Sequence, residues 1–184
     1  MDHSSGSRRR TPPSPAVVTR HLPLSAEDAW ALVTDVRNHG RWIPMTRMDA
    51  PAVLTPGAQF TAVTGPGATA GSPGLADRMT VLTLVPPDTA SGRTGRVVLR
   101  KDGPVLLGTA EIVVVPRGPD DALVTWVEDV HLRFLPARWT RRPLRPVLAG
   151  MSRYALRQIS REVSGGARRN DPPPIPRGTQ RSVT

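Results

Sequence analysis

The chain predicts one α+β domain over residues 16–164, in which an antiparallel sheet of about seven strands is combined with a long C-terminal helix. From about residue 50 to 132 the apolar side chains occur at strand spacing, and each run ends in turn residues such as "KDGP" at 101–104. From 144 to 163 they recur at the spacing of a helix. The strand connections are shorter than the dozen or so residues that parallel neighbours need, so we expect an antiparallel sheet.

Three elements are expected ahead of these strands. Residues 16–22 alternate as a strand, and residues 24–36 carry an apolar helical stripe with Ser25 as its N-cap. Asp28 stands three residues further on, in the capping-box position. A second short helix or turn ends at Pro44, because the residue before a proline disfavours helical geometry.

The C-terminal helix is expected to begin between residues 143 and 146. Pro143 and Pro146 suit the first turn of a helix and not its middle, so residues 137–142 are predicted to form a separate short segment. A Gly-Gly pair at 165 and 166 is expected to end the helix.

Both ends of the chain, residues 1–15 and 165–184, consist largely of Ser, Gly, Pro and Arg. They contain too little apolar surface to offset the entropy of ordering them, so we predict two disordered tails. These tails also carry about half of the net charge of +10.

The composition excludes several classes of protein. There is no cysteine, which excludes disulfides, thiolate metal sites and cysteine nucleophiles. No apolar run approaches the roughly 18 residues of a membrane span. The basic residues are 24 arginines and a single lysine, Lys101, a bias typical of G+C-rich coding. We therefore expect a bacterial protein located in the cytoplasm.

The order of elements resembles the helix-grip fold, in which a curved antiparallel sheet wraps around the last helix. The segments "LPLSAEDAWALVTDVRNHGRWIP", "PGAQF", "LADRMTVLTLVPP", "VLLGTAEIVVVP" and "ALVTWVEDV" together resemble the polyketide cyclase/dehydrase-like branch of the START and Bet v 1-like superfamily, the SRPBCC proteins. The resemblance covers about residues 16–163. It implies an internal cavity for a small hydrophobic or aromatic molecule, such as a polyketide- or lipid-like metabolite. Some members of the superfamily are enzymes and others are not, so the resemblance leaves catalysis open.

Glu128 is the candidate catalytic residue. Alternate side chains of a strand share one face, so in the segment 124–132 Glu128 lies on the apolar face and Asp129 on the opposite face. A carboxylate on an inward face must be protonated, paired or reached by water. Arg78 and Arg100 are its candidate partners. A structural ion pair and a role as proton carrier in cofactor-free cyclisation or dehydration both remain open.

Further residues are candidates for contacting the ligand. Trp42, Phe60 and Trp126 would supply aromatic surface, with core packing as the alternative, and Tyr154 would supply a hydroxyl from the edge of the last helix. Arg78 is included as a charged partner. The histidines show no metal-ligand spacing and "GPGATAG" lacks the lysine of a phosphate loop, so no metal and no cofactor are expected.

The rival hypothesis is a protein that binds nucleic acid or an anionic surface without catalysis. Its basis is the segment from Arg133 to Arg161, which contains eight arginines and no acidic residue. No recognition motif accompanies these arginines, and charge at this spacing is typical of a solvated helix face. We therefore expect a small hydrophobic partner and no specific nucleic acid, and the oligomeric state stays open.

Overall fold

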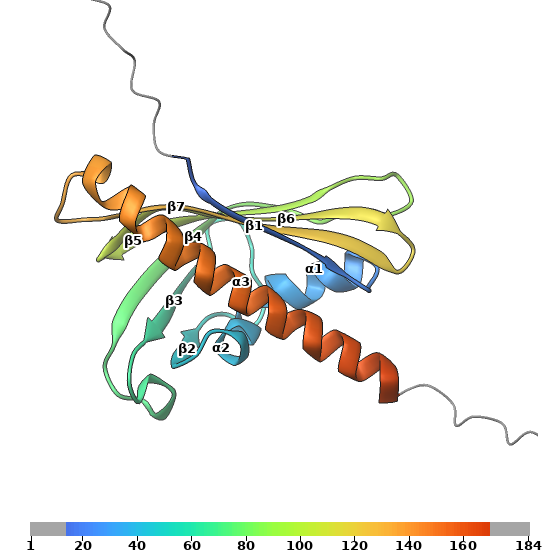
Figure 1. The fold of residues 1–184 in the computed structure, drawn as a ribbon, viewed down its shortest axis with the longest axis horizontal. Helices are drawn as coiled ribbons and strands as arrows, with labels where there is room; N and C mark the ends of the chain where they lie inside the picture. The colour runs from blue at the N-terminus through green and yellow to red at the C-terminus, as the bar shows by residue number, and fades with distance from the viewer. Residues whose placement is uncertain (1–13, 170–184) are drawn as a thin grey trace, which may run out of the picture.

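The computed structural model describes residues 14–169 (Figure 1). Their strands form one antiparallel sheet of seven in the order β1-β7-β6-β5-β4-β3-β2. The strands are β1 (Ala16–Leu22), β2 (Thr46–Asp49), β3 (Gln59–Thr64), β4 (Leu75–Val85), β5 (Gly95–Pro104), β6 (Leu106–Gly118) and β7 (Asp121–Leu132). Strands β2 to β7 pair with their neighbours in sequence, as their short connections predict. The tails predicted at the two ends of the chain lie largely outside the described residues.

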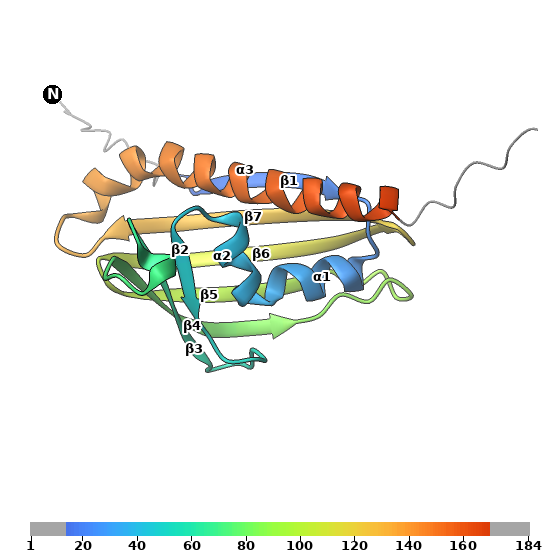
Figure 2. The same ribbon diagram turned by 90° about the horizontal axis from the view of Figure 1, so that it is seen from below.

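The helices lie on one face of this sheet. After β1 come α1 (Ala26–Thr34), the 3-10 turn η1 (Val36–Asn38) and α2 (His39–Trp42), and the chain ends in α3 (Ala137–Arg169), with a second 3-10 turn, η2 (Ala68–Ala70), between β3 and β4. Figure 2 shows α3 running alongside β1 and β7, while α1 and α2 cover the middle of the sheet. The predicted helix-grip fold is confirmed.

The start of α1 follows the capping chemistry that the sequence predicts. The backbone N–H of Asp28 donates to Oγ of Ser25 at 3.0 Å, and that hydroxyl donates to the Asp28 carboxylate at 2.7 Å. The short α2 ends at Trp42, and Ile43 is extended just before Pro44. The predicted second short helix is therefore confirmed.

The core lies between the curled sheet and the helices. Leu156 and Ile159 of α3, Val33 of α1 and Trp42 of α2 are almost fully buried in one cluster with the inward side chains of the strands. Burying one large apolar side chain contributes roughly 1.5–3 kcal/mol. This packing fixes α3 and α2 against the sheet, and the cavity described below lies between them.

Both predicted ends of the last helix were wrong. Helix α3 begins at Ala137 and includes Pro143 and Pro146, and it continues past the Gly-Gly pair to Arg169. Both prolines are exposed, so the carbonyls that lose a donor to the missing proline N–H lie on the side where water can bond them. Among the described residues no helix, α3 included, is long and apolar enough to cross a membrane.

Candidate functional site

A cavity of about 310 Å³ lies between the inner face of the sheet, α2 and the first half of α3. Most of its wall is apolar and comes from β3 to β7, with Phe60, Met79, Leu99 and Ile112 among the lining side chains. Val147 of α3 also lines it, although 66% of this residue is exposed. The cavity therefore reaches the surface beside α3.

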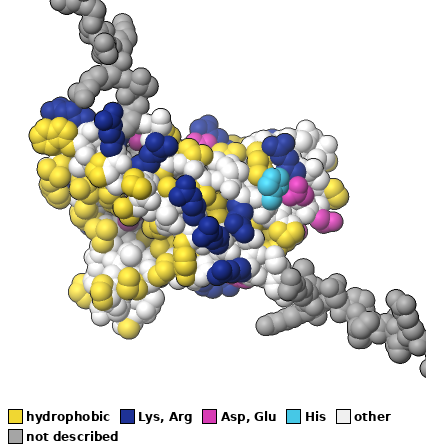
Figure 3. Space-filling view, viewed as in Figure 1, with side chains coloured by type: hydrophobic (Ala, Val, Ile, Leu, Met, Phe, Trp, Pro, Cys, Tyr) yellow, Lys and Arg dark blue, Asp and Glu magenta, His cyan; other side chains and the backbone are white. Residues whose placement is uncertain are grey.

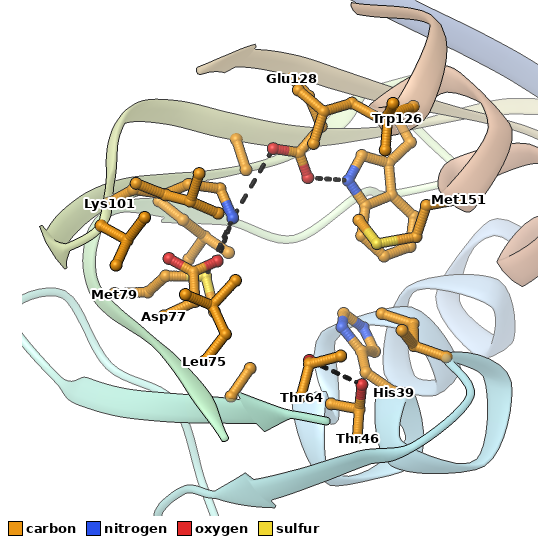
Figure 4. Close-up of a pocket in the computed structure, with 18 of the residues that line it drawn as sticks. His39, Thr46, Thr64, Leu75, Asp77, Met79, Lys101, Trp126, Glu128 and Met151 are labelled. Atoms are coloured by element: carbon orange, nitrogen blue, oxygen red, sulfur yellow. Dashed lines mark hydrogen bonds and ion pairs between the residues drawn. The ribbon is translucent and has the colours of Figure 1, made fainter. Parts of the chain in front are cut away.

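Three charged side chains form a polar cluster on one wall of this apolar cavity (Figure 4). They are Asp77 of β4, Lys101 of β5 and Glu128 of β7, with side chains 13%, 5% and 2% exposed. The Nζ atom of Lys101 lies 2.5 Å from Oδ2 of Asp77 and 3.7 Å from Oε2 of Glu128. The indole N–H of Trp126 donates to Oε1 of Glu128 at 3.0 Å.

The cluster is incompletely hydrogen-bonded. Oε2 of Glu128 and Oδ1 of Asp77 are buried and have no hydrogen-bond partner among the described residues. Buried polar atoms are nearly always paired, and an unpaired one costs about 1–3 kcal/mol. These two oxygens therefore mark the place where a bound molecule or water would supply the missing bonds.

Burial and the neighbouring charges act in opposite directions on the pKa of Glu128 and on the pKa of Lys101. Burial raises the pKa of Glu128 above its ordinary value of 4.5, even though Lys101 and the Trp126 N–H act in the other direction. Burial alone would lower the pKa of Lys101, but the carboxylates of Glu128 and Asp77 outweigh it and raise this pKa. Lys101 therefore stays charged, while Glu128 is held toward its protonated form.

Replacing Glu128 with Gln should change how stability depends on pH. The pKa of Glu128 is raised in the folded state, so this state binds the proton more tightly than the unfolded chain does. The wild-type chain therefore loses stability as the pH rises from 4.5 through the raised pKa, and Glu128→Gln does not. Urea unfolding gives the free energy of unfolding of both proteins. The value for the variant minus that for the wild type should increase with rising pH and then level off. A difference that is constant between about pH 4 and 8 would contradict this.

His39 of α2 lies on the opposite wall of the cavity (Figure 4). Its Nε2–H donates to the carbonyl of Val33 at 2.9 Å, and its ring packs against the ring of Trp126 with centroids 5.2 Å apart. Burial lowers the pKa of His39, so the ring is neutral and Nδ1 is an acceptor. The cavity thus has a carboxyl group on one wall and an imidazole on the other.

The orientation predicted for Glu128 is confirmed. Glu128 faces the cavity, whereas Asp129 lies on the outer face and forms a half-exposed ion pair with Arg141, 3.1 Å from Asp Oδ1 to Arg Nε. Each residue of β7 follows the alternation that the sequence indicates, from buried Val124 to buried Val130.

The predicted partners of Glu128 were wrong. Arg78 and Arg100 are both exposed on the outer face, where Arg100 pairs with Asp102. The register shift between Val81 and Thr83 leaves Leu82 as an extra residue in β4 and breaks its simple alternation, so Arg78 does not share the inward face of Leu84. Lys101 occupies the place that was expected for an arginine.

The four predicted aromatic ligand contacts divide into two pairs. Phe60 and Trp126 line the cavity. Trp42 is buried but does not line it, and its indole N–H donates to Glu162 of α3 at 2.8 Å, so it fastens α2 to α3. Tyr154 is 45% exposed and its hydroxyl accepts a hydrogen bond from Gln158. Trp42, Arg78 and Tyr154 therefore do not line the cavity, and for Trp42 the alternative of core packing holds.

Three titratable residues of the cavity wall were missed, namely Asp77, Lys101 and His39. Residues 101–104, which were expected to form a turn, belong to β5, and Val97, Leu99 and Lys101 alternate onto one face of this strand. A lone lysine on an apolar face calls for acidic partners by the same argument that singled out Glu128. Within residues 14–169 no group of three or more His, Asp or Glu residues is arranged to hold a metal ion.

Comparison with known proteins places the chain in a family. A family model described as polyketide cyclase / dehydrase and lipid transport matches residues 16–164. The chain belongs to this family. A search of curated protein sequences finds no match to the chain.

Several solved structures have the same fold as this chain. A START superfamily protein from Mycobacterium smegmatis is 15% identical, with a TM-score of 0.54, covering 85% of this chain and 99% of its own. A hypothetical protein from Helicobacter pylori is 11% identical, with a TM-score of 0.59, covering 80% of this chain and 87% of its own. The di-domain ARO/CYC protein StfQ from the steffimycin biosynthetic pathway is 16% identical, with a TM-score of 0.57, and the match covers 84% of this chain and 52% of StfQ. At these identities the structural likeness shows the fold alone.

Proposed function

We propose that this member of the polyketide cyclase / dehydrase and lipid transport family binds a small hydrophobic or aromatic molecule, polyketide- or lipid-like, in the cavity beside α3. The observation that carries the proposal is an apolar cavity with one buried polar cluster on its wall. Ligand sites of proteins are mostly apolar, about 300–1,000 Å³ in volume, with a few convergent polar groups. The cavity of about 310 Å³ suits a compact ligand of one to three rings.

Filling the cavity should weaken ligand binding without unfolding the chain. Ala62 of β3 and Ala110 of β6 line the cavity, and Ala62→Leu or Ala110→Leu would each place three further carbons inside it. We expect affinity for a fluorescent hydrophobic probe to fall about tenfold or more, since overpacking a site costs about 1–3 kcal/mol. Ala90→Leu is the matched control, because Ala90 is exposed in the turn between β4 and β5. Native mass spectrometry of the protein purified from its own source would identify a molecule that remains bound.

Equal probe binding by both cavity variants and by the control would contradict the proposal. A drop in binding that follows a loss of the folded state would not support it either, so thermal unfolding is measured on each variant. The two cavity variants lie on different strands. Weaker probe binding by both, with both still folded, would therefore be due to the cavity that they share and not to a local defect in one strand.

We further propose that turnover, where it occurs, is cofactor-free dehydration or cyclisation with Glu128 as proton carrier. Its raised pKa keeps a proton available, and the lowered pKa of His39 leaves a neutral imidazole as a base on the other wall. In the dehydration of a β-hydroxy carbonyl compound, His39 Nδ1 would take the α proton and Glu128 would protonate the hydroxyl, which leaves as water as the C=C bond forms. Loss of one water from the bound molecule, seen with the wild-type chain and absent with Glu128→Gln, would support these roles.

Binding of nucleic acid or an anionic surface is the weaker candidate. Seven of the eight arginines between 133 and 161 are exposed, and Figure 3 shows basic side chains along the outer side of α3 with other side chains between them. This is the usual arrangement of a solvated helix face. Arg141, the eighth, pairs with Asp129. The hollows beside these arginines, at Arg153 and Arg157 and at Arg142 and Arg145, are more open to solvent than the cavity. The more enclosed apolar cavity is the feature that favours a small ligand.

A further inference from the structure

The hydrogen-bonding pattern of the polar cluster indicates which chemical group its ligand presents. One oxygen of Glu128, Oε1, already accepts the Trp126 indole N–H, and the other, Oε2, has no hydrogen-bond partner. Only 2% of the Glu128 side chain is exposed. Figure 4 shows it on the cavity wall beside Lys101.

Lys101 leaves donor capacity at the same place. An ammonium group has three N–H donors. One lies against Asp77 Oδ2 at 2.5 Å, and another faces the weakly accepting sulfur of Met79 at 3.9 Å. The 3.7 Å from Nζ to Glu128 Oε2 is too long for a direct hydrogen bond. An oxygen atom between these two groups would accept from Lys101 and reach Oε2 of Glu128.

The net charge and the hydrogen bonding of the cluster determine which kind of ligand oxygen fits between Lys101 and Glu128. Lys101 faces two carboxyl groups, so the net charge of the cluster is −1 when both carboxyl groups are ionised and zero when one is, and it is positive in neither state. An anionic head group brought into this wall would lose its hydration without meeting a net positive charge. A carbonyl oxygen can accept from Lys101 and from protonated Glu128 but cannot bond ionised Oε2, whereas a hydroxyl group can accept from Lys101 and bond Glu128 in either state.

We infer that the ligand carries a hydroxyl group that lies between Lys101 Nζ and Glu128 Oε2, and that the site disfavours the same molecule with a carboxylate in that position. The inference rests on the proposed ligand binding. The remaining wall accepts an apolar or aromatic body, since Phe60, Leu99 and Ile112 present only carbon to it. Because a hydroxyl both donates and accepts, it matches Glu128 in either protonation state.

Three probes with the same naphthalene ring system test this inference: naphthalene, 2-naphthol and 2-naphthoate, each titrated by calorimetry into the full-length chain at neutral pH. We expect 2-naphthol to bind about tenfold more tightly than naphthalene, a difference of about 1.4 kcal/mol, because its hydroxyl would form a hydrogen bond to a charged group. We expect 2-naphthoate to bind more weakly than 2-naphthol by a similar factor.

Variants at Glu128 test whether this residue causes the preference for 2-naphthol over naphthalene. Glu128→Leu should reduce the preference for 2-naphthol over naphthalene to about one- to threefold, while Asp129→Leu, on the opposite face of the same strand, should leave it unchanged. Naphthalene itself reports whether the cavity is intact in each variant. If Glu128→Leu does not fold, Glu128→Gln serves instead: its amide N–H can donate to a carboxylate, so the discrimination against 2-naphthoate should shrink.

The outcomes separate the inference from the proposed function. Binding of all three probes with equal affinity, or tightest binding of 2-naphthoate, would overturn the inference and leave the cavity as a ligand site. An unchanged preference for 2-naphthol in Glu128→Leu would overturn it as well. Failure of all three probes to bind would overturn the proposed function and the inference with it.

Discussion

Lys101→Met should lower the free energy of unfolding by about 3–5 kcal/mol, the loss typical of removing one partner from a buried ion pair. The lysine is the positive charge between Asp77 and Glu128, and all three side chains are buried or nearly so. Methionine preserves most of the side-chain length and volume, so the change removes the charge with little change in packing. Two carboxyl groups would then face each other across a low-dielectric wall with no cation between them. Urea unfolding at neutral pH measures the loss.

Arg100→Met is the matched control, because it removes the charge of the neighbouring residue of the same strand. The Arg100 side chain is 52% exposed and pairs with Asp102 on the outer face, and an exposed ion pair of this kind contributes at most about 1 kcal/mol. Asp77→Asn and Glu128→Gln, added to Lys101→Met, should recover most of the lost stability, because they neutralise the two carboxylates that the lysine compensates. A loss below about 1 kcal/mol in Lys101→Met, or no recovery in the triple variant, would show that the cluster is not held together by this charge.

The fold could be predicted because it depends on the spacing of apolar residues and on short turns, which are local properties of the sequence. The orientation of Glu128 could be predicted for the same reason, since β7 keeps regular alternation from Asp121 to Leu132. The partner of Glu128 could not be predicted from alternation in β4. The extra residue that β4 contains after Val81 depends on pairing with β5, and it changes which side chains of β4 face inward.

His39 shows a second limit of sequence reasoning. It lies in a helix of four residues, too short for an apolar period to identify the buried face. Its burial comes from contacts made far away in sequence, among them the ring of Trp126 on β7. The ends of α3 show a third limit. Pro143, Pro146 and the Gly-Gly pair disfavour a helix locally, but packing of the middle of α3 against β7 and β1 outweighs them.

Two glycine-to-alanine replacements should change stability in opposite directions. Gly108 of β6 lies opposite Val130 of β7, beside the pair that aligns Ala110 with Glu128. Its φ of 132° is a conformation that side chains rarely adopt, and a Cβ atom built there would lie 2.1 Å from the carbonyl oxygen of Asp129. That contact is with backbone, so it can be relieved only by moving β6 away from β7. We expect Gly108→Ala to cost about 3 kcal/mol or more, combining backbone strain of about 1–3 kcal/mol with overpacking of a similar size.

Gly150 is the counterpart in α3. A Cβ atom added there meets nothing within 4 Å, and the residue is exposed in the interior of a helix. Gly150→Ala should therefore raise the free energy of unfolding by about 0.5–1 kcal/mol, because alanine loses less conformational entropy than glycine in a helix. Denaturant unfolding of the two variants compares them directly, and a Gly108→Ala variant as stable as the wild type would mean that β6 and β7 are not in the register described. Since that register turns Glu128 toward the cavity and Asp129 away from it, hydrophobic probe binding measured on Gly108→Ala should fall together with its stability, whereas Gly150→Ala should bind the probe as the wild type does.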